Sequence, residues 1–246
     1  DPKHVEIIIK ELGLERARKA ETPRVKMSPM QAWEVDESTP LDREGQRLFR
    51  SCLMRAAYLG QDRLDISEAV KCLSQAMATP REGHLAQLKR LARYLGNRPR
   101  TALKYEAQES RLARIQAYTD SDWAGEAISR RSTSGMVIRR GSHIVRHSST
   151  LQTSIGLSSA EAEYYAMTKG AACALGIQSL LRDWGLDNPI ELYSDSSSAR
   201  SFAKRRGLGK QRHIDTRYLW LQDHVAVKKI KVLSVRTDEN PADVFT

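Results

Sequence analysis

Apolar positions in the first part of the chain recur every three or four residues, which is the period of an α-helix. The pattern predicts a short helix over residues 3–12 and longer ones over 44–59, 65–78 and 81–96. Residues 20–42 are rich in Pro, Ser, Thr and acidic side chains, and this composition predicts a linker. Asn97-Arg98-Pro99 ends the last helix, so we expect an all-helical segment up to this point.

After residue 100 the pattern changes, and β-strands are expected to alternate with helices. Strands are predicted over 102–106, 114–119, 133–139, 143–149, 190–194 and 230–235. Helices are predicted over 159–184, 196–205 and 213–227, with a short one at Asn240-Pro241. From residue 114 onward this order predicts an α/β fold in which helices flank a mixed sheet.

Charge and cysteine content narrow the classes of partner. The formal net charge is +10, with 20 Lys and Arg against 16 Asp and Glu in residues 1–110 and 20 against 14 in the rest. A basic protein attracts polyanions such as nucleic acids, although many basic proteins bind none. No apolar run approaches the length of a membrane span, so we expect no membrane partner. Three widely spaced cysteines without a Cys-x-x-Cys pair favour a reducing, intracellular compartment over a secreted protein.

Two aspartates stand where strands are predicted to end. Asp120 follows the strand Ile115–Thr119, and Asp195 follows the strand Ile190–Ser194. Carboxylates at the ends of neighbouring strands can point into one crevice, which is the usual place for a site in such sheets. Taken alone, each of them is more often an ordinary turn or helix-cap residue.

The long predicted helix offers two glutamates, and their patterns differ. Ser158 and Glu161 fit a capping box in which Glu161 reaches back to the N-cap amide. Glu163 instead heads the apolar stripe that should pack on the sheet, where a carboxylate is costly unless it is paired or binds a metal. Glu163 is therefore the favoured ligand. Asp243 falls in the first turn after Asn240-Pro241, where the helix dipole alone would explain an acid.

A cluster of Asp120, Glu163, Asp195 and Asp243 would need cations to offset its repulsion. Hard oxygen ligands of this kind suit Mg²⁺ or Mn²⁺. Two such ions stabilise the attacking and leaving oxygens of a phosphoryl displacement. We therefore expect two Mg²⁺ (or Mn²⁺) ions as cofactors.

Six ordered motifs carry a family resemblance over residues 111–246. They are Tyr118-Thr-Asp-Ser-Asp-Trp-Ala-Gly125, Arg130-Arg-Ser-Thr-Ser-Gly135, Leu157-Ser-Ser-Ala-Glu-Ala-Glu-Tyr164, Tyr193-Ser-Asp195, His213-Ile-Asp-Thr-Arg-Tyr218 and Asn240-Pro-Ala-Asp243. Together they resemble the ribonuclease H domain of copia-type LTR retrotransposon Pol polyproteins. The resemblance implies a ribonuclease H-like mixed five-stranded sheet with flanking helices, preceded by a helical connection segment.

The same resemblance assigns the family's catalytic and metal-binding acids to Asp120, Glu163, Asp195 and Asp243. Glu163 is selected again because Glu163-Tyr-Tyr-Ala166 fits the family's Glu-x-x-Ala pattern, and Asp122 is the main rival near the first position. His147 departs from the family, which often has an aromatic residue there, so local packing at this position is in question.

The resemblance extends more loosely to the first part of the chain and implies a domain plan. Residues 1–43 would be the end of a reverse transcriptase thumb and a linker, 44–110 a helical connection segment, and 111–246 the ribonuclease H-like domain. The start and the end of the sequence suggest a fragment of a longer polyprotein, whose reverse transcriptase domain would be a partner. The polymerase's own Asp-Asp turn is absent from the sequence, so we expect no DNA synthesis.

An RNA–DNA hybrid would be held through its backbone by basic and small polar side chains. The candidates form two groups, which are Arg130, Arg131, Ser132 and Thr133, and Lys204, Arg205, Arg206, Lys210 and Arg212. A solvated basic loop is the competing explanation for the second group. His213 is a candidate proton carrier in the same loop, and a cap or core histidine is equally consistent with its position.

The leading hypothesis is a ribonuclease H-type endonuclease that hydrolyses the RNA strand of RNA–DNA hybrids by two-metal-ion catalysis during reverse transcription. The alternatives are a catalytically inactive nucleic-acid-binding remnant and a scaffold module that neither binds nor cleaves. The four placed acids favour the enzyme.

Overall fold

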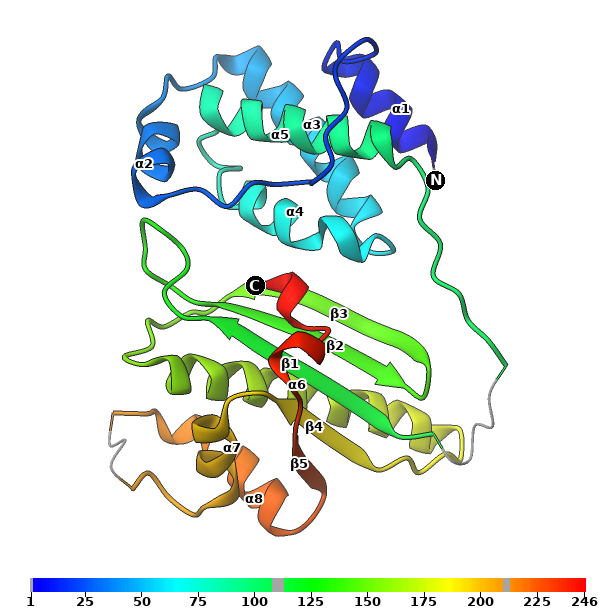
Figure 1. The fold of residues 1–246 in the computed structure, drawn as a ribbon, viewed down its shortest axis with the longest axis vertical. Coiled ribbons are helices and arrows are strands. Elements are labelled where there is room, and N and C mark those ends of the chain that lie inside the picture. The colour runs from blue at the N-terminus through cyan, green and yellow to red at the C-terminus, as the bar shows by residue number, and fades with distance from the viewer. Residues whose placement is uncertain (1, 108–112, 210–212) are drawn as a thin grey trace. The chain divides into compact units, whose positions relative to one another are not determined.

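The computed structural model describes residues 2–107, 113–209 and 213–246, and the chain divides into two compact units, Asp1–Leu103 and Lys104–Thr246 (Figure 1). The first unit is helical. Its elements are α1 (Pro2–Glu11), α2 (Pro29–Glu37), α3 (Arg43–Leu59), the 3-10 turn η1 (Leu64–Ile66), α4 (Ser67–Ser74) and α5 (Glu82–Asn97). Val5 and Ile8 of α1 share one core with Phe49 and Leu53 of α3 and with Leu91 of α5. The start of the chain is thus an integral part of this helical unit.

Two expectations about irregular regions were wrong. Residues 20–42 contain the helix α2, which begins at the N-cap Ser28 and has Pro29 in its first turn and a capping box with Gln31. This local signal outweighs a composition that is typical of linkers. Residues 102–106 form no strand, since every strand of the sheet lies at or beyond Ile115.

The second unit is built on one mixed sheet. Its elements are β1 (Ile115–Asp122), β2 (Thr133–Arg140), β3 (His143–Leu151), α6 (Ser159–Asp183), β4 (Ile190–Ser194), α7 (Ser197–Lys204), η3 (Thr216–Tyr218), α8 (Trp220–Ala226), β5 (Ile230–Ser234), η4 (Thr237–Glu239) and η5 (Asp243–Phe245). The strand order is β3-β2-β1-β4-β5. Strand β2 is antiparallel to its neighbours β1 and β3, while β4 is parallel to β1 and β5 is parallel to β4. The predicted five-stranded mixed sheet with flanking helices is confirmed. The predicted helix 213–227 is instead two short pieces, η3 and α8, and the one near Asn240 is a 3-10 turn.

Glycines allow two close approaches that position the site. A Cβ on Gly170 of α6 would stand 2.4 Å from Thr119 Cγ2 of β1, so the helix lies directly on this strand. A Cβ on Gly135 of β2 would stand 2.5 Å from the Ala242 carbonyl oxygen, next to η5. Gly135 is paired with Asp120 in the sheet, and Thr119 with Met136. Because successive strand residues face opposite sides, α6 covers one face and η5 the other (Figure 1).

Candidate metal centre

Sheet register brings Asp120 and Asp195 together. Tyr118 of β1 pairs with Tyr193 of the parallel neighbour β4, and the two rings stack with their centroids 4.7 Å apart. Asp120 and Asp195 each lie two residues further on, at the same edge of the sheet. Side chains two residues apart on a strand share a face, so the two carboxylates extend the row that the tyrosines begin. Asp195 follows the end of β4 as predicted, whereas β1 continues to Asp122, so Asp120 lies within the strand, two residues before its end.

Glu163 reaches this edge from the first turns of α6. Ser158 caps the helix by accepting a hydrogen bond from the Glu161 amide at 3.2 Å. Glu163 is only 5% exposed, and its Oε1 accepts a hydrogen bond from the Ser121 amide at 3.1 Å. Its Oε2 is buried and has no hydrogen-bond partner. A buried carboxylate oxygen without a donor is unfavourable unless a cation or a proton satisfies it.

Asp120, Glu163 and Asp195 each offer a carboxylate oxygen, and these atoms lie within 4.8 Å of one another. Burial, together with the charges of Asp120 and Asp195, raises the pKa of Glu163 to about 9. Burial also raises the pKa of Asp120, as do Asp195 and Asp243, against a lowering by the Thr246 hydroxyl. The three carboxylates therefore form an acidic cluster compatible with a hard divalent cation.

Asp243 lies beside this cluster, outside the group of three that the described residues form. It begins η5, and its charge contributes to the raised pKa of Asp120. Thr246 links the two, because its hydroxyl lies 2.6 Å from Asp120 Oδ2 and 3.0 Å from the Asp243 carbonyl oxygen. Thr237 donates a hydrogen bond to Asp195 Oδ2 at 2.7 Å. Sequence reasoning missed both threonines, since a hydroxyl in a 3-10 turn leaves no pattern.

The two rival acids are engaged elsewhere. The Glu161 carboxylate is 3% exposed and accepts hydrogen bonds from the Leu157 amide at 2.8 Å, from the Tyr165 hydroxyl and from His213. Although burial raises its pKa, these bonds bring the pKa below the ordinary value. The capping contact therefore runs to the Leu157 amide instead of the Ser158 amide that the sequence suggested. Asp122 accepts a hydrogen bond from the Thr133 amide.

The first group of basic and polar candidates lies between β1 and β2. Arg130 and Arg131 are exposed, and Arg130 has a positive φ of 58°. Ser132 and Thr133 are buried, and the Ser132 hydroxyl accepts a hydrogen bond from the Ala124 amide at 3.0 Å. Of this group, the two arginines are the side chains presented to solvent.

The second group lies at and after the end of α7. Lys204 is the last residue of α7. Arg205 lies 4.3 Å from the centroid of the Phe202 ring and donates to the Leu208 carbonyl at 2.7 Å. Lys204, Arg205 and Arg206 are exposed, whereas Lys210 and Arg212 lie outside the described residues.

Two histidines have defined partners. His213 Nε2 lies 2.9 Å from Glu161 Oε2, so the ring contacts a carboxylate outside the cluster of three. His147 stacks on Phe245 of η5 with ring centroids 5.4 Å apart. The imidazole therefore supplies an aromatic contact where the family pattern often has an aromatic side chain.

The chain has relatives among transposon polyproteins. It is 29% identical over 250 residues to the retrovirus-related Pol polyprotein from transposon TNT 1-94 of Nicotiana tabacum, which covers 99% of this chain. It is 32% identical over 201 residues to the Pol polyprotein from transposon RE1 of Arabidopsis thaliana, which covers 80%. The chain is a homologue of retrovirus-related Pol polyproteins. This Pol homologue spans 18% and 14% of the length of these two relatives.

Among solved structures, the Pol homologue is similar to LC11-RNase H1, isolated from compost by a metagenomic approach. The sequences are 17% identical, the superposition covers 54% of this chain and 91% of the other, and the TM-score is 0.39. No protein-family model matches the chain. In the part of the chain that the structure describes, every helix is too short or too polar to cross a membrane.

Proposed function

We propose that this Pol homologue is a ribonuclease H-type endonuclease that hydrolyses the RNA strand of RNA–DNA hybrids during retroelement reverse transcription. The observation that carries the proposal is the meeting of the Asp120, Glu163 and Asp195 carboxylates at the carboxyl ends of β1 and β4. The homology to Pol polyproteins supports the retroelement context.

The residues present fit divalent metal ions. The buried, unpartnered Oε2 of Glu163 and the all-oxygen donor set favour Mg²⁺ or Mn²⁺. Asp120, Glu163 and Asp195 would hold two ions together with Asp243 from η5. Such ions, when bound, lower the pKa of an attacking water and offset charge on the leaving oxygen. The Ser121 amide holds Glu163 in place, while the hydroxyls of Thr246 and Thr237 orient Asp120 and Asp195.

The hybrid would be held by the exposed basic side chains. Arg130 and Arg131 follow β1, which carries Asp120, and Lys204, Arg205 and Arg206 follow α7, which begins just after Asp195. In the sequence, each set therefore follows an element that carries or adjoins a carboxylate of the cluster. Their contacts to phosphates would make affinity fall steeply with salt. The reverse transcriptase domain of the polyprotein would be the partner that produces the hybrid, in an intracellular particle or the nucleus.

The domain plan follows from the same proposal. The unit Asp1–Leu103 would combine the end of the polymerase thumb with the connection segment, and the unit from Lys104 would hold the nuclease.

Cleavage of a labelled RNA–DNA hybrid with Mg²⁺ or Mn²⁺ tests the function. We expect wild type to cut the RNA strand, Asp195→Asn to abolish cleavage, and the exposed-site control Asp187→Asn to retain it. Asp187 lies in the same unit and pairs with Arg182 at 2.8 Å, away from the cluster. Equal activity of wild type and Asp195→Asn would contradict the proposal. Salt-sensitive hybrid binding without turnover would instead indicate an inactive nucleic-acid-binding remnant.

A further inference from the structure

The first turns of α6 hold two buried glutamates that face different neighbours. Glu163 extends toward the strands, where the Ser121 amide donates to it. Glu161 stands two residues earlier, and helix positions two apart do not face each other. Its carboxylate instead joins His213 Nε2 at 2.9 Å, the Tyr165 hydroxyl and the Leu157 amide. The acidic cluster and the Glu161 contacts are therefore separate features of one helix end.

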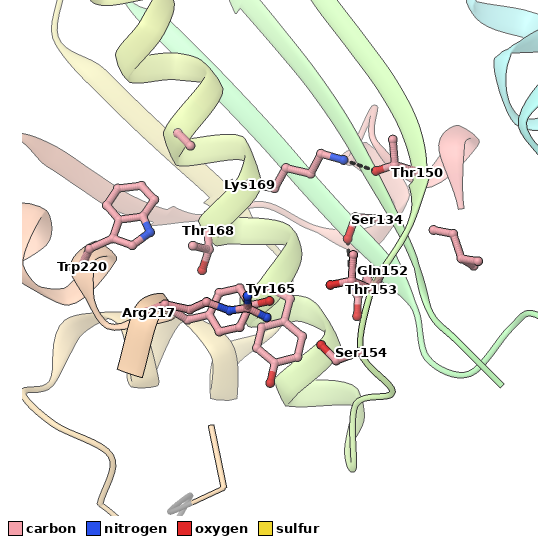
Figure 2. Close-up of a pocket in the computed structure, with 13 residues that line it drawn as sticks. Ser134, Thr150, Gln152, Thr153, Ser154, Tyr165, Thr168, Lys169, Arg217 and Trp220 are labelled. Atoms are coloured by element: carbon pink, nitrogen blue, oxygen red, sulfur yellow. Dashed lines mark hydrogen bonds between the residues drawn. The ribbon is translucent and has the colours of Figure 1, made fainter. Parts of the chain in front are cut away.

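His213 begins a segment that is fastened along α6. The Tyr164 hydroxyl donates to the Tyr218 carbonyl at 2.8 Å, and the rings of Tyr165 and Tyr218 lie 4.4 Å apart. Ile214 is 2% exposed and belongs to the core of the unit. Figure 2 shows Tyr165 of α6 beside Arg217 at the edge of a cavity of about 300 Å³ that both segments line. The segment 213–218 is thus fixed to the helix that carries Glu163.

The chain is also fixed at Gly207, which follows the basic residues Lys204, Arg205 and Arg206. Gln222 of α8 is 3% exposed, and its Oε1 accepts a hydrogen bond from the Gly207 amide at 2.8 Å. Its Nε2 donates to the Phe202 carbonyl at 3.0 Å and the Gly207 carbonyl at 3.3 Å. On the two described sides of residues 210–212, the chain is therefore held at Gly207 by the buried Gln222 amide and at His213 by the buried Glu161 carboxylate.

We propose that Glu161 and His213 are positioning residues. Their contact fixes the chain at His213, which follows the basic candidates Lys204, Arg205 and Arg206 in the sequence, to the helix that carries Glu163, and so sets the affinity for the RNA–DNA hybrid. This inference rests on the proposed function only for the identity of the ligand. It gives His213 a positioning role through the contact between its Nε2 atom and Glu161, and the kinetics below separate this role from proton transfer. Loss of the contact would release His213 from α6, while the carboxylates of the cluster would keep their hydrogen-bond partners.

The steady-state kinetics of the full chain separate the two roles. His213→Ala is expected to raise the KM for a labelled hybrid by up to about tenfold, a limit set by the loss of one charge-assisted hydrogen bond, and to leave kcat within about twofold. His213→Gln is expected to recover most of the affinity, because its amide can donate to Glu161. The control His224→Ala removes a histidine whose ring contacts Trp220 of its own helix, and it should change neither constant. A fall in kcat at constant KM would overturn the proposal in favour of a proton carrier.

Hybrid binding in EDTA, followed by fluorescence anisotropy, distinguishes this inference from the nuclease proposal. We expect His213→Ala and Glu161→Gln each to weaken binding about tenfold, and the double variant to weaken it no further, since both remove one contact. If wild type binds the hybrid but does not cleave it, weaker binding by the two variants still supports the positioning role, while the nuclease proposal fails. Unchanged binding in both variants, or no hybrid binding by wild type, overturns the inference.

Discussion

Replacing Glu163 with Gln should stabilise the metal-free protein while abolishing its response to metal. Glu163 is 5% exposed, one of its oxygens has no donor, and two further carboxylates lie near it. Gln keeps an oxygen that can accept from the Ser121 amide, as Glu163 Oε1 does. Its amide nitrogen would take the place of the unpartnered oxygen and could donate to a neighbouring aspartate. The substitution therefore removes an unfavourable charge and keeps the favourable contact.

The magnitude follows from the pKa of Glu163, which burial and the charges of Asp120 and Asp195 together raise from 4.5 to about 9 in the folded protein. Between these values the folded state holds a proton that the unfolded state has released, so stability falls as pH rises through this window. The slope is about 1.4 kcal/mol per pH unit for one proton. From pH 4.5 to pH 7 the accumulated loss is about 3 kcal/mol, which is the upper limit of the gain that Glu163→Gln should give at pH 7.

Glu161→Gln is the matched control, because it changes a glutamate of equal burial on the same helix. Hydrogen bonds from Tyr165, His213 and Leu157 keep the pKa of Glu161 below its ordinary value, despite the raising effect of burial. The folded state therefore favours the ionised form of Glu161. This stabilises the fold at pH values above the pKa of Glu161 in the unfolded chain, and the stabilisation is lost as pH falls through its pKa in the folded protein. We expect Glu161→Gln to destabilise the protein at pH 7 by about 1–3 kcal/mol.

Urea unfolding in EDTA, followed by tryptophan fluorescence, measures both variants. Three of the four tryptophans (Trp123, Trp184 and Trp220) lie in the second unit, so the signal reports mainly on it. At pH 5 the gain from Glu163→Gln should shrink below about 1 kcal/mol, because the unfolded state then keeps much of the proton. Added Mg²⁺ should stabilise wild type alone. A loss of stability in Glu163→Gln at pH 7, or the same sign in both variants, would refute this reasoning.

Three further predictions concern the surroundings of the cluster. Gly135→Ala should displace η5, since its Cβ would stand 2.5 Å from the Ala242 carbonyl oxygen; we expect a loss of about 1–3 kcal/mol in urea unfolding and a loss of hybrid cleavage. Asp243→Asn should weaken Mn²⁺ binding less than Asp120→Asn in calorimetric titrations, because Asp243 lies outside the group of three, and equal losses would contradict this. His147→Phe should change the unfolding free energy by less than about 1 kcal/mol, since it keeps the stack on Phe245.

Periodicity predicted most of the second unit because its strands and long helix bury whole faces of side chains. The helix predicted over 159–184 is observed as α6, Ser159–Asp183. The strand predicted over 190–194 is observed as β4, Ile190–Ser194. The helix α2 was missed because it buries little, with Ala32 as its buried residue and Trp33 53% exposed. Its only strong signal is the local cap at Ser28. Short elements on weak apolar faces therefore depend on their caps and escape a periodicity argument.

The candidate site was predictable to the extent that it depends on strand ends and helix phase. The predicted strand ends indicated Asp120 and Asp195, and the helix phase favoured Glu163 over Glu161. The place of Asp243 depends on how η5 lies on β2 at Gly135, a contact between residues more than a hundred positions apart. The partner of His213 depends on the path of the chain after α7. Neither long-range arrangement leaves a trace in local spacing.

Burial alone does not distinguish the two glutamates of α6, since Glu161 and Glu163 are 3% and 5% exposed. The difference lies in the number of donors, because Glu161 accepts three hydrogen bonds and Glu163 accepts one. A buried carboxylate with its full set of donors is stable as an anion, whereas one that lacks donors needs a cation or a proton. The same helix end therefore carries a self-sufficient acid that fastens the segment starting at His213 and an unsatisfied acid that is suited to metal. Because both depend on where α6 begins, weakening the Ser158 cap should disturb metal binding and hybrid binding together.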